Sequence, residues 1–136
     1  MSEPKKTVLI VDDEPSVVTY LSTVLEDAGF ATLHAENGEQ GLRLFEEAEP
    51  DLVSLDINMP KMSGMKLYRQ MRENERLSGV PIVVVTAVTG YGADPEEFRR
   101  FLDSRKHLAK ADGFLAKPID PSEFVDVVRR LTGDGG

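Results

Sequence analysis

Three short, almost unbroken apolar runs restrict the fold of this chain more than any other feature. They occupy residues 8–11, 52–55 and 80–85. A strand with one solvated face alternates apolar and polar residues, whereas a strand covered on both faces is apolar throughout. Covered strands of this kind are typical of parallel sheets with helices on both sides. The runs therefore predict an α/β domain.

Two weaker strand candidates occupy residues 31–35 and 113–116, which makes five in all. Between successive strand candidates, apolar residues recur at the spacing of a helix. Pro15, Asn37 with Gln40, Asp94 and Asp120 mark helix starts, and a further helix is expected over residues 64–74. Five strands alternating with five helices imply right-handed crossovers. We expect a flavodoxin-like, doubly wound (βα)5 three-layer sandwich, with a parallel five-stranded sheet in the order 2-1-3-4-5.

Polar residues stand at the ends of four predicted strands: Asp12 with Asp13, then Asp56, Thr86 and Lys117. The carboxyl ends of parallel strands share one edge of the sheet, where open α/β folds bind their ligands. In the expected order, Asp12 and Asp13 lie beside Asp56. Asp56 also ends a buried strand, where structure alone does not require an acid.

This combination of residues is typical of phosphoryl transfer. Three clustered carboxylates repel one another unless a cation intervenes. Mg2+ suits such a site because it takes carboxylate oxygens together with water and phosphate oxygens, and Mn2+ is an alternative. Lys117 supplies positive charge and Thr86 a hydroxyl for an anion. Asp56 has the central position, so we assign it the role of nucleophile that forms an aspartyl phosphate.

Composition excludes several other classes. The chain has 136 residues, the size of one domain, and we expect a flexible lead over residues 1–6, the domain over 7–132 and a flexible tail over 133–136. Its net charge of −8 argues against direct binding of nucleic acid. It has no cysteine, which excludes disulfides and thiolate sites. Neither a signal peptide nor an apolar run of about 20 residues is present, so we expect a cytoplasmic protein without a membrane segment.

The chain resembles the response-regulator receiver domain over residues 6–132, nearly its whole length. The motifs that carry the resemblance are VLIVDDEP at residues 8–15, LDINMP at 55–60 with Gly64, VVVTA at 83–87 and KP at 117–118. Each motif is weak alone, whereas all of them in order at matching strand ends are very specific.

The resemblance implies that Asp56 accepts a phosphoryl group from a phosphohistidine, carried by a sensor histidine kinase or a histidine phosphotransfer protein. Asp13 and Asp56 would bind Mg2+ by side chain, Asp12 mostly through water, and Asn58 through its backbone carbonyl. The protein would be a phosphoacceptor and not an enzyme, with self-phosphorylation from small donors and autodephosphorylation as its only reactions.

By the same resemblance, Thr86 and Lys117 would contact the phosphoryl oxygens and Phe114 would be the switch aromatic. Inward movement of Thr86 would let Phe114 turn and repack the face of the fourth helix, fifth strand and fifth helix. The interval from Thr86 to Lys117 is 31 positions (117 − 86), longer than the family usually shows, and Phe114 replaces a commoner tyrosine. The sequence identifies no downstream partner or effector domain, and we expect a monomer or a phosphorylation-linked dimer.

Three alternatives remain. A haloacid-dehalogenase-like phosphohydrolase would need an acid where Asn58 stands. A flavodoxin-like nucleotide binder would need a Gly/Ser/Thr-rich loop where this chain has Asp12, Asp13 and Glu14. A receiver-fold adaptor that acts without phosphorylation would have the same fold but no phosphorylation switch. Separately, the Asp12–Asp13 pair has a purely structural interpretation as a cap of the first helix.

Overall fold

A computed structural model describes residues 5–57, 64–87 and 112–133. Over these ranges the chain forms five strands and four helices. The strands are β1 (Thr7–Val11), β2 (Ala31–Ala35), β3 (Leu52–Asp56), β4 (Ile82–Ala87) and β5 (Gly113–Lys117). The helices are α1 (Pro15–Asp27), α2 (Gly38–Ala48), α3 (Gly64–Glu73) and α5 (Pro121–Thr132). The helix predicted to begin at Asp94 lies outside the described residues.

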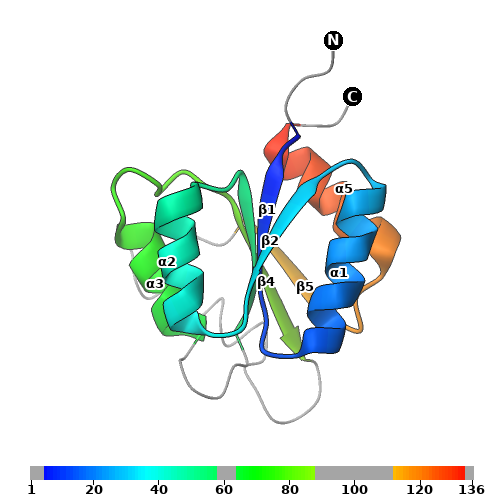
Figure 1. Ribbon diagram of the computed structural model, residues 1–136, viewed down its shortest axis with the longest axis horizontal. Helices are drawn as coiled ribbons and strands as arrows, with labels where there is room; N and C mark the ends of the chain where they lie inside the picture. The colour runs from blue at the N-terminus through cyan, green and yellow to red at the C-terminus, as the bar shows by residue number, and fades with distance from the viewer. Residues whose placement is uncertain (1–4, 58–63, 88–111, 134–136) are drawn as a thin grey trace.

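The strands form one parallel sheet in the order β2-β1-β3-β4-β5, which confirms the predicted topology. Figure 1 shows three layers, with α2 and α3 on one face of the sheet and α1 and α5 on the other. All five strands run in the same direction. Their carboxyl ends therefore meet at the lower edge of the sheet in this view.

Two apolar clusters fill the space between the sheet and its helices. Within β1, Leu9 and Val11 face α2 and α3, whereas Val8 and Ile10 face α1 and α5. All residues of the central strand β3 are buried. Burial on both faces explains why the strongest strand signals in the sequence are continuous and not alternating.

Side-chain caps stand at the starts of two of the described helices, α2 and α5. Asn37 accepts a hydrogen bond from the Gln40 backbone N–H (2.8 Å), and Asp120 accepts from the N–H groups of Ser122 (2.8 Å) and Glu123 (3.2 Å). Gln40 reaches back to the backbone N–H of Glu36 (2.8 Å), one residue earlier than in a standard capping box. These bonds satisfy backbone donors that helix starts leave unpaired.

The buried face of α2 differs from its sequence pattern. Helical spacing puts the apolar residues Leu42, Phe45 and Ala48 on one face and predicts that this face is buried, but Ala48 is exposed and Gly41 is buried. A Cβ at Gly41 would lie only 3.2 Å from Cγ2 of Val11. The missing side chain therefore lets α2 approach β1 closely, just before the strand reaches Asp12.

Strand β4 also begins later than expected, at Ile82 instead of Val80. Val80 belongs to the preceding turn, where its N–H donates to the Leu77 carbonyl (3.1 Å). Among the described helices, none has the length and apolar character to cross a membrane.

Candidate functional site

Asp56 is the last residue of β3 and is almost fully buried, with a relative exposure of 2%. Its strand lies between β1 and β4, and the backbone partner of Asp56 on β4 is Val85. The next residue, Ile57, continues the pairing through an N–H bond to the Val85 carbonyl (3.1 Å). Pairing with β4 thus holds the Asp56 backbone at the carboxyl edge of the sheet.

Asp12 is held next to Asp56 by strand register. Val11 pairs with Leu55, so the residue that follows β1 lies alongside the last residue of β3. The N–H of Asp12 donates to the Ala35 carbonyl (3.1 Å), and the side chain is likewise only 2% exposed. Two carboxylates from neighbouring strands are therefore buried together.

The prediction that Asp12 and Asp13 cap the first helix is only partly correct. The N-cap of α1 is Glu14, whose side chain makes no capping hydrogen bond. Asp12 Oδ1 instead accepts from the Glu14 backbone N–H (2.9 Å), which orders the turn before the helix. One oxygen of Asp12 thus shapes the loop, and the carboxylate still faces the other acids.

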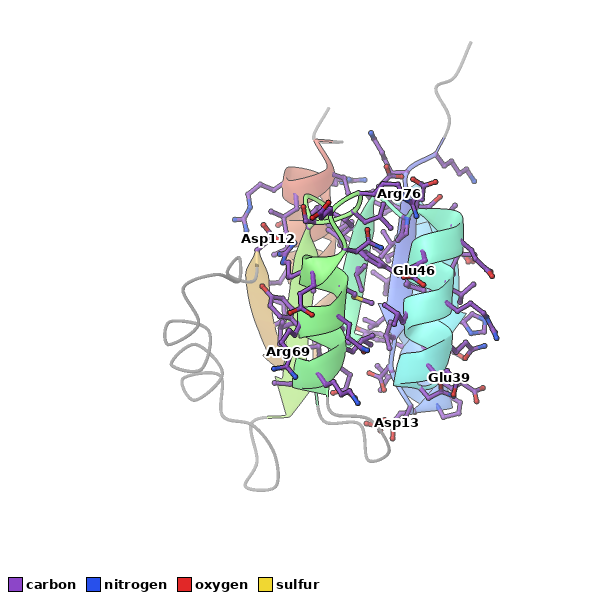
Figure 2. All side chains as sticks on the ribbon, turned by 90° about the vertical axis from the view of Figure 1, so that its left-hand side faces the viewer. Asp13, Glu39, Glu46, Arg69, Arg76 and Asp112 are labelled. Carbon is purple, nitrogen blue, oxygen red and sulfur yellow. The ribbon has the colours of Figure 1, made fainter. Side chains whose placement is uncertain are left out.

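The structure brings four carboxylates together at this edge. Asp12, Asp13, Glu14 and Asp56 each place a carboxylate oxygen within 4.8 Å of the others. Figure 2 shows Asp13 at the lower edge of the sheet, below the start of α2. Glu14 was not among the ligands expected from the sequence. Its position next to Asp12 and Asp13 is a signal that could have suggested it.

The charge and geometry of this cluster fit a hard divalent cation. Two unit charges 4.8 Å apart repel by about 3.5 kcal/mol at an effective dielectric constant of about 20. Burial of Asp12 and Asp56 adds a desolvation penalty to their ionised forms. A cation with oxygen ligands relieves both effects, and Mg2+ or Mn2+ suits the site because it binds some of these carboxylates directly and keeps water for its other positions. Asp13 and Glu14, which are more exposed, leave the cluster open to solvent on one side.

The remaining expected site residues lie on β4, which is next to β3, and on β5, the strand beyond it. Thr86 pairs with Ala116, and Lys117 ends β5 opposite Ala87, so both backbones lie at the same edge as Asp56. Phe114 pairs with Val84, three residues before Lys117. The proposed ligand carbonyl of Asn58 falls outside the described residues.

Comparison with known proteins supports the resemblance seen in the sequence. The family profile described as "Response regulator receiver domain" matches residues 8–129. The polar-differentiation response regulator DivK of Brucella anthropi is 28% identical over 129 residues, covering 95% of this chain and 98% of DivK. The alkaline phosphatase synthesis transcriptional regulatory protein PhoP of Bacillus subtilis is 36% identical over 118 residues. That match covers 87% of this chain but only 45% of PhoP.

Solved structures show the same architecture. A response regulator from Chloroflexus aurantiacus superposes with a TM-score of 0.81 at 30% identity, covering 96% of this chain and 99% of that one. A CheY-like receiver domain protein from Methanospirillum hungatei gives a TM-score of 0.80 at 25% identity, with 96% of each chain covered.

Proposed function

This chain belongs to the response-regulator receiver family, and we propose that it is a signalling module switched by phosphorylation of Asp56. The observation that carries the proposal is the buried carboxylate of Asp56 at the centre of the sheet edge, with Asp12, Asp13 and Glu14 around it. The end of a buried strand does not need four neighbouring acids for its own stability, so the acids point to a function.

The proposed reaction is an exchange of one bond to phosphorus. A carboxylate oxygen of Asp56 attacks the phosphorus of a phosphohistidine, the P–N bond breaks, and the imidazole retains the electron pair and takes up a proton. The product is an acyl phosphate on Asp56. Bound Mg2+ would neutralise the carboxylates and the developing charge on the phosphoryl oxygens.

The chain's own residues would position that reaction. Asp12 and Asp13 would hold the cation beside Asp56, and we propose a smaller part for Glu14 at the exposed side of the cluster. Lys117 and Thr86, at the ends of the next two strands, would contact the phosphoryl oxygens. We further propose that the signal leaves through the face formed by the predicted fourth helix, β5 and α5.

A kinase or phosphotransfer protein that carries phosphohistidine is the proposed donor, and the cytoplasm is the proposed location. The type of donor separates this proposal from the phosphohydrolase alternative. Phosphoramidate contains the P–N bond of phosphohistidine, whereas p-nitrophenyl phosphate is a monoester. We expect stoichiometric labelling of the protein by phosphoramidate with Mg2+, and no steady release of p-nitrophenol. Continuous turnover of the monoester would favour the hydrolase, and absence of labelling from any small donor would favour the adaptor.

A further inference from the structure

A buried arginine lies at the opposite edge of the sheet from the acidic cluster. Arg72, in the last turn of α3, has a side chain only 4% exposed. Its Nη1 donates to the carbonyls of Ser78 (3.0 Å) and Val80 (2.9 Å), and its Nε to the hydroxyl of Tyr68 (3.2 Å). The guanidinium thus joins α3 to the turn that leads into β4.

The same guanidinium binds the residue that precedes β5. Its Nη2 lies 2.6 Å from Oδ2 of Asp112, which forms a charge-assisted pair. That oxygen also accepts the N–H of Ile82 (2.9 Å), the first residue of β4. In return the backbone N–H of Asp112 donates to the Ile82 carbonyl (3.0 Å). Asp112 is therefore fixed to β4 by both its backbone and its carboxylate.

These bonds lie where β5 acquires its register. Strand β5 has five residues, begins directly after Asp112 and ends at Lys117. The pairing runs from Val83 with Gly113 to Ala87 with Lys117, without interruption. Figure 2 shows Asp112 at the upper edge of the sheet, opposite the edge that carries Asp13. Because an extended strand rises about 3.3 Å per residue, the backbone of Lys117 lies about 16 Å from Asp112 along β5. The pairing of Asp112 with β4 therefore determines where the backbone of Lys117 lies.

The register of β5 depends on its pairing with β4 alone, because β5 is an edge strand of the sheet. A slip by one residue would exchange the faces of all its side chains. It would also move the backbone of Lys117 along the sheet by one residue, away from the position opposite Ala87.

We infer that Arg72 and Asp112 are positioning residues for phosphoryl transfer, which set the register of β5 and thereby place Lys117 at the edge beside Asp56. This inference rests on the proposed function, since it assigns Lys117 a contact with the phosphoryl group. Neither residue touches the reacting atoms. They would act on the reaction indirectly, because the register of β5 determines the position of Lys117.

The chain offers a matched control for the ion pair. Arg76 and Glu49 also form an Arg–carboxylate contact, at 2.7 Å, but both side chains are 55% exposed. Their pair joins the loop after α3 to the end of α2, where Arg76 also donates to the Glu46 carbonyl (3.2 Å). Glu49→Ala therefore removes an ion pair of the same kind without affecting the register of β5.

The test is a double-mutant cycle between Asp112→Ala and Lys117→Ala, with the rate of phosphorylation by acetyl phosphate and Mg2+ as the readout. We expect Asp112→Ala to slow the reaction about tenfold to a hundredfold in the wild-type background, the size typical of a small misplacement. In the Lys117→Ala background the same substitution should have no further effect. Glu49→Ala should leave the rate unchanged.

Amide hydrogen exchange supplies a second readout that needs no phosphorylation. Asp112→Ala should speed exchange in β5 relative to β1, and Asp112→Asn, which retains an acceptor for Ile82, should fall between it and wild type. An equal loss of rate in both backgrounds, or unchanged exchange in β5, would overturn the inference. If wild type itself is not phosphorylated, the proposed function fails, and exchange in β5 alone decides whether Asp112 sets the register.

Discussion

Asp12 and Asp56 lie side by side at the carboxyl edge of the sheet, one directly after β1 and the other at the end of β3. The register that pairs Val11 with Leu55 fixes this relationship through the backbone. Both side chains are 2% exposed, so two acids share a buried site. The register of β1 and β3 therefore sets the distance between these two charges.

Substitution of Asp13 tests the cation site. We expect Asp13→Asn to weaken Mg2+ binding by at least about tenfold, because even residues that only orient metal ligands have effects of that size. Glu14→Gln should weaken it less. Calorimetric titration with Mg2+ and Mn2+ measures both, with Glu46→Gln on the exposed face of α2 as the control. Unchanged affinity in Asp13→Asn would contradict the assignment.

The same substitution should change stability in opposite directions with and without metal. In EDTA, Asp13→Asn removes repulsion within the cluster and should raise the free energy of unfolding by roughly 1 kcal/mol, after allowance for solvent screening. Addition of Mg2+ at about 100 times its Kd should stabilise wild type by about 2.7 kcal/mol. The variant should gain much less at that concentration. Thermal unfolding of both proteins in EDTA and in Mg2+ gives all four values.

Gly41 should not tolerate a methyl group. In Gly41→Ala the new Cβ would lie 3.2 and 3.3 Å from the two γ-carbons of Val11. Overpacking of this kind costs about 1 to 3 kcal/mol, which the better helix propensity of alanine, about 1 kcal/mol, only partly offsets.

Gly79→Ala is the matched control, because a Cβ at that position would have no other atom within 4 Å. It should be neutral or stabilise by up to about 1 kcal/mol. Denaturant unfolding compares the two variants. A Gly41→Ala protein as stable as Gly79→Ala would show that α2 can move away from β1 without loss.

Tyr68 should make stability fall at high pH. Its side chain is fully buried, and this burial raises the pKa of the phenol above the ordinary value of 10.0, although the Arg72 guanidinium acts in the opposite direction. The folded state therefore keeps a proton that the unfolded chain releases. Its contribution to stability is complete below about pH 10 and declines as the pH rises through the folded pKa.

Tyr68→Phe should remove that part of the decline and, at neutral pH, reduce stability by about 1 to 3 kcal/mol through loss of the Arg72 hydrogen bond. The slopes of unfolding free energy against pH are compared above pH 9, so that the lysines common to both proteins cancel. Equal slopes would contradict the raised pKa.

The topology and the gathering of acids could be predicted because their signals are local. Apolar runs covered on both faces identify a parallel sheet, and in such a sheet every strand end lies at a known edge. The acids that follow residues 8–11 and 52–55 could thus be assigned to one site. Cap residues such as Asn37 and Asp120 fixed helix starts for the same reason.

The arginine network could not be predicted in this way. Helical spacing places Tyr68 and Arg72 on the same face as Leu67 and Met71, but a charged arginine is expected in solvent, whereas Arg72 is buried. What permits their burial is a set of partners supplied by tertiary structure, above all Asp112, which is 40 positions away. Gly41 differs from its pattern for a similar reason, since the closeness of Val11 depends on how α2 packs on the sheet.

The most direct test of Asp56 as the phosphoacceptor is the intact mass of the protein after incubation with acetyl phosphate. With Mg2+, wild type should gain the mass of one phosphoryl group, and the adduct should be lost on treatment with hydroxylamine, as an acyl phosphate requires. Asp56→Asn should gain nothing, and neither should wild type in EDTA. Asp27→Asn, an exposed acid at the far end of α1, should behave as wild type. Wild type without a mass change, or Asp56→Asn that still gains an acid-labile or hydroxylamine-sensitive phosphoryl group, would contradict the assignment of Asp56 as the phosphoacceptor.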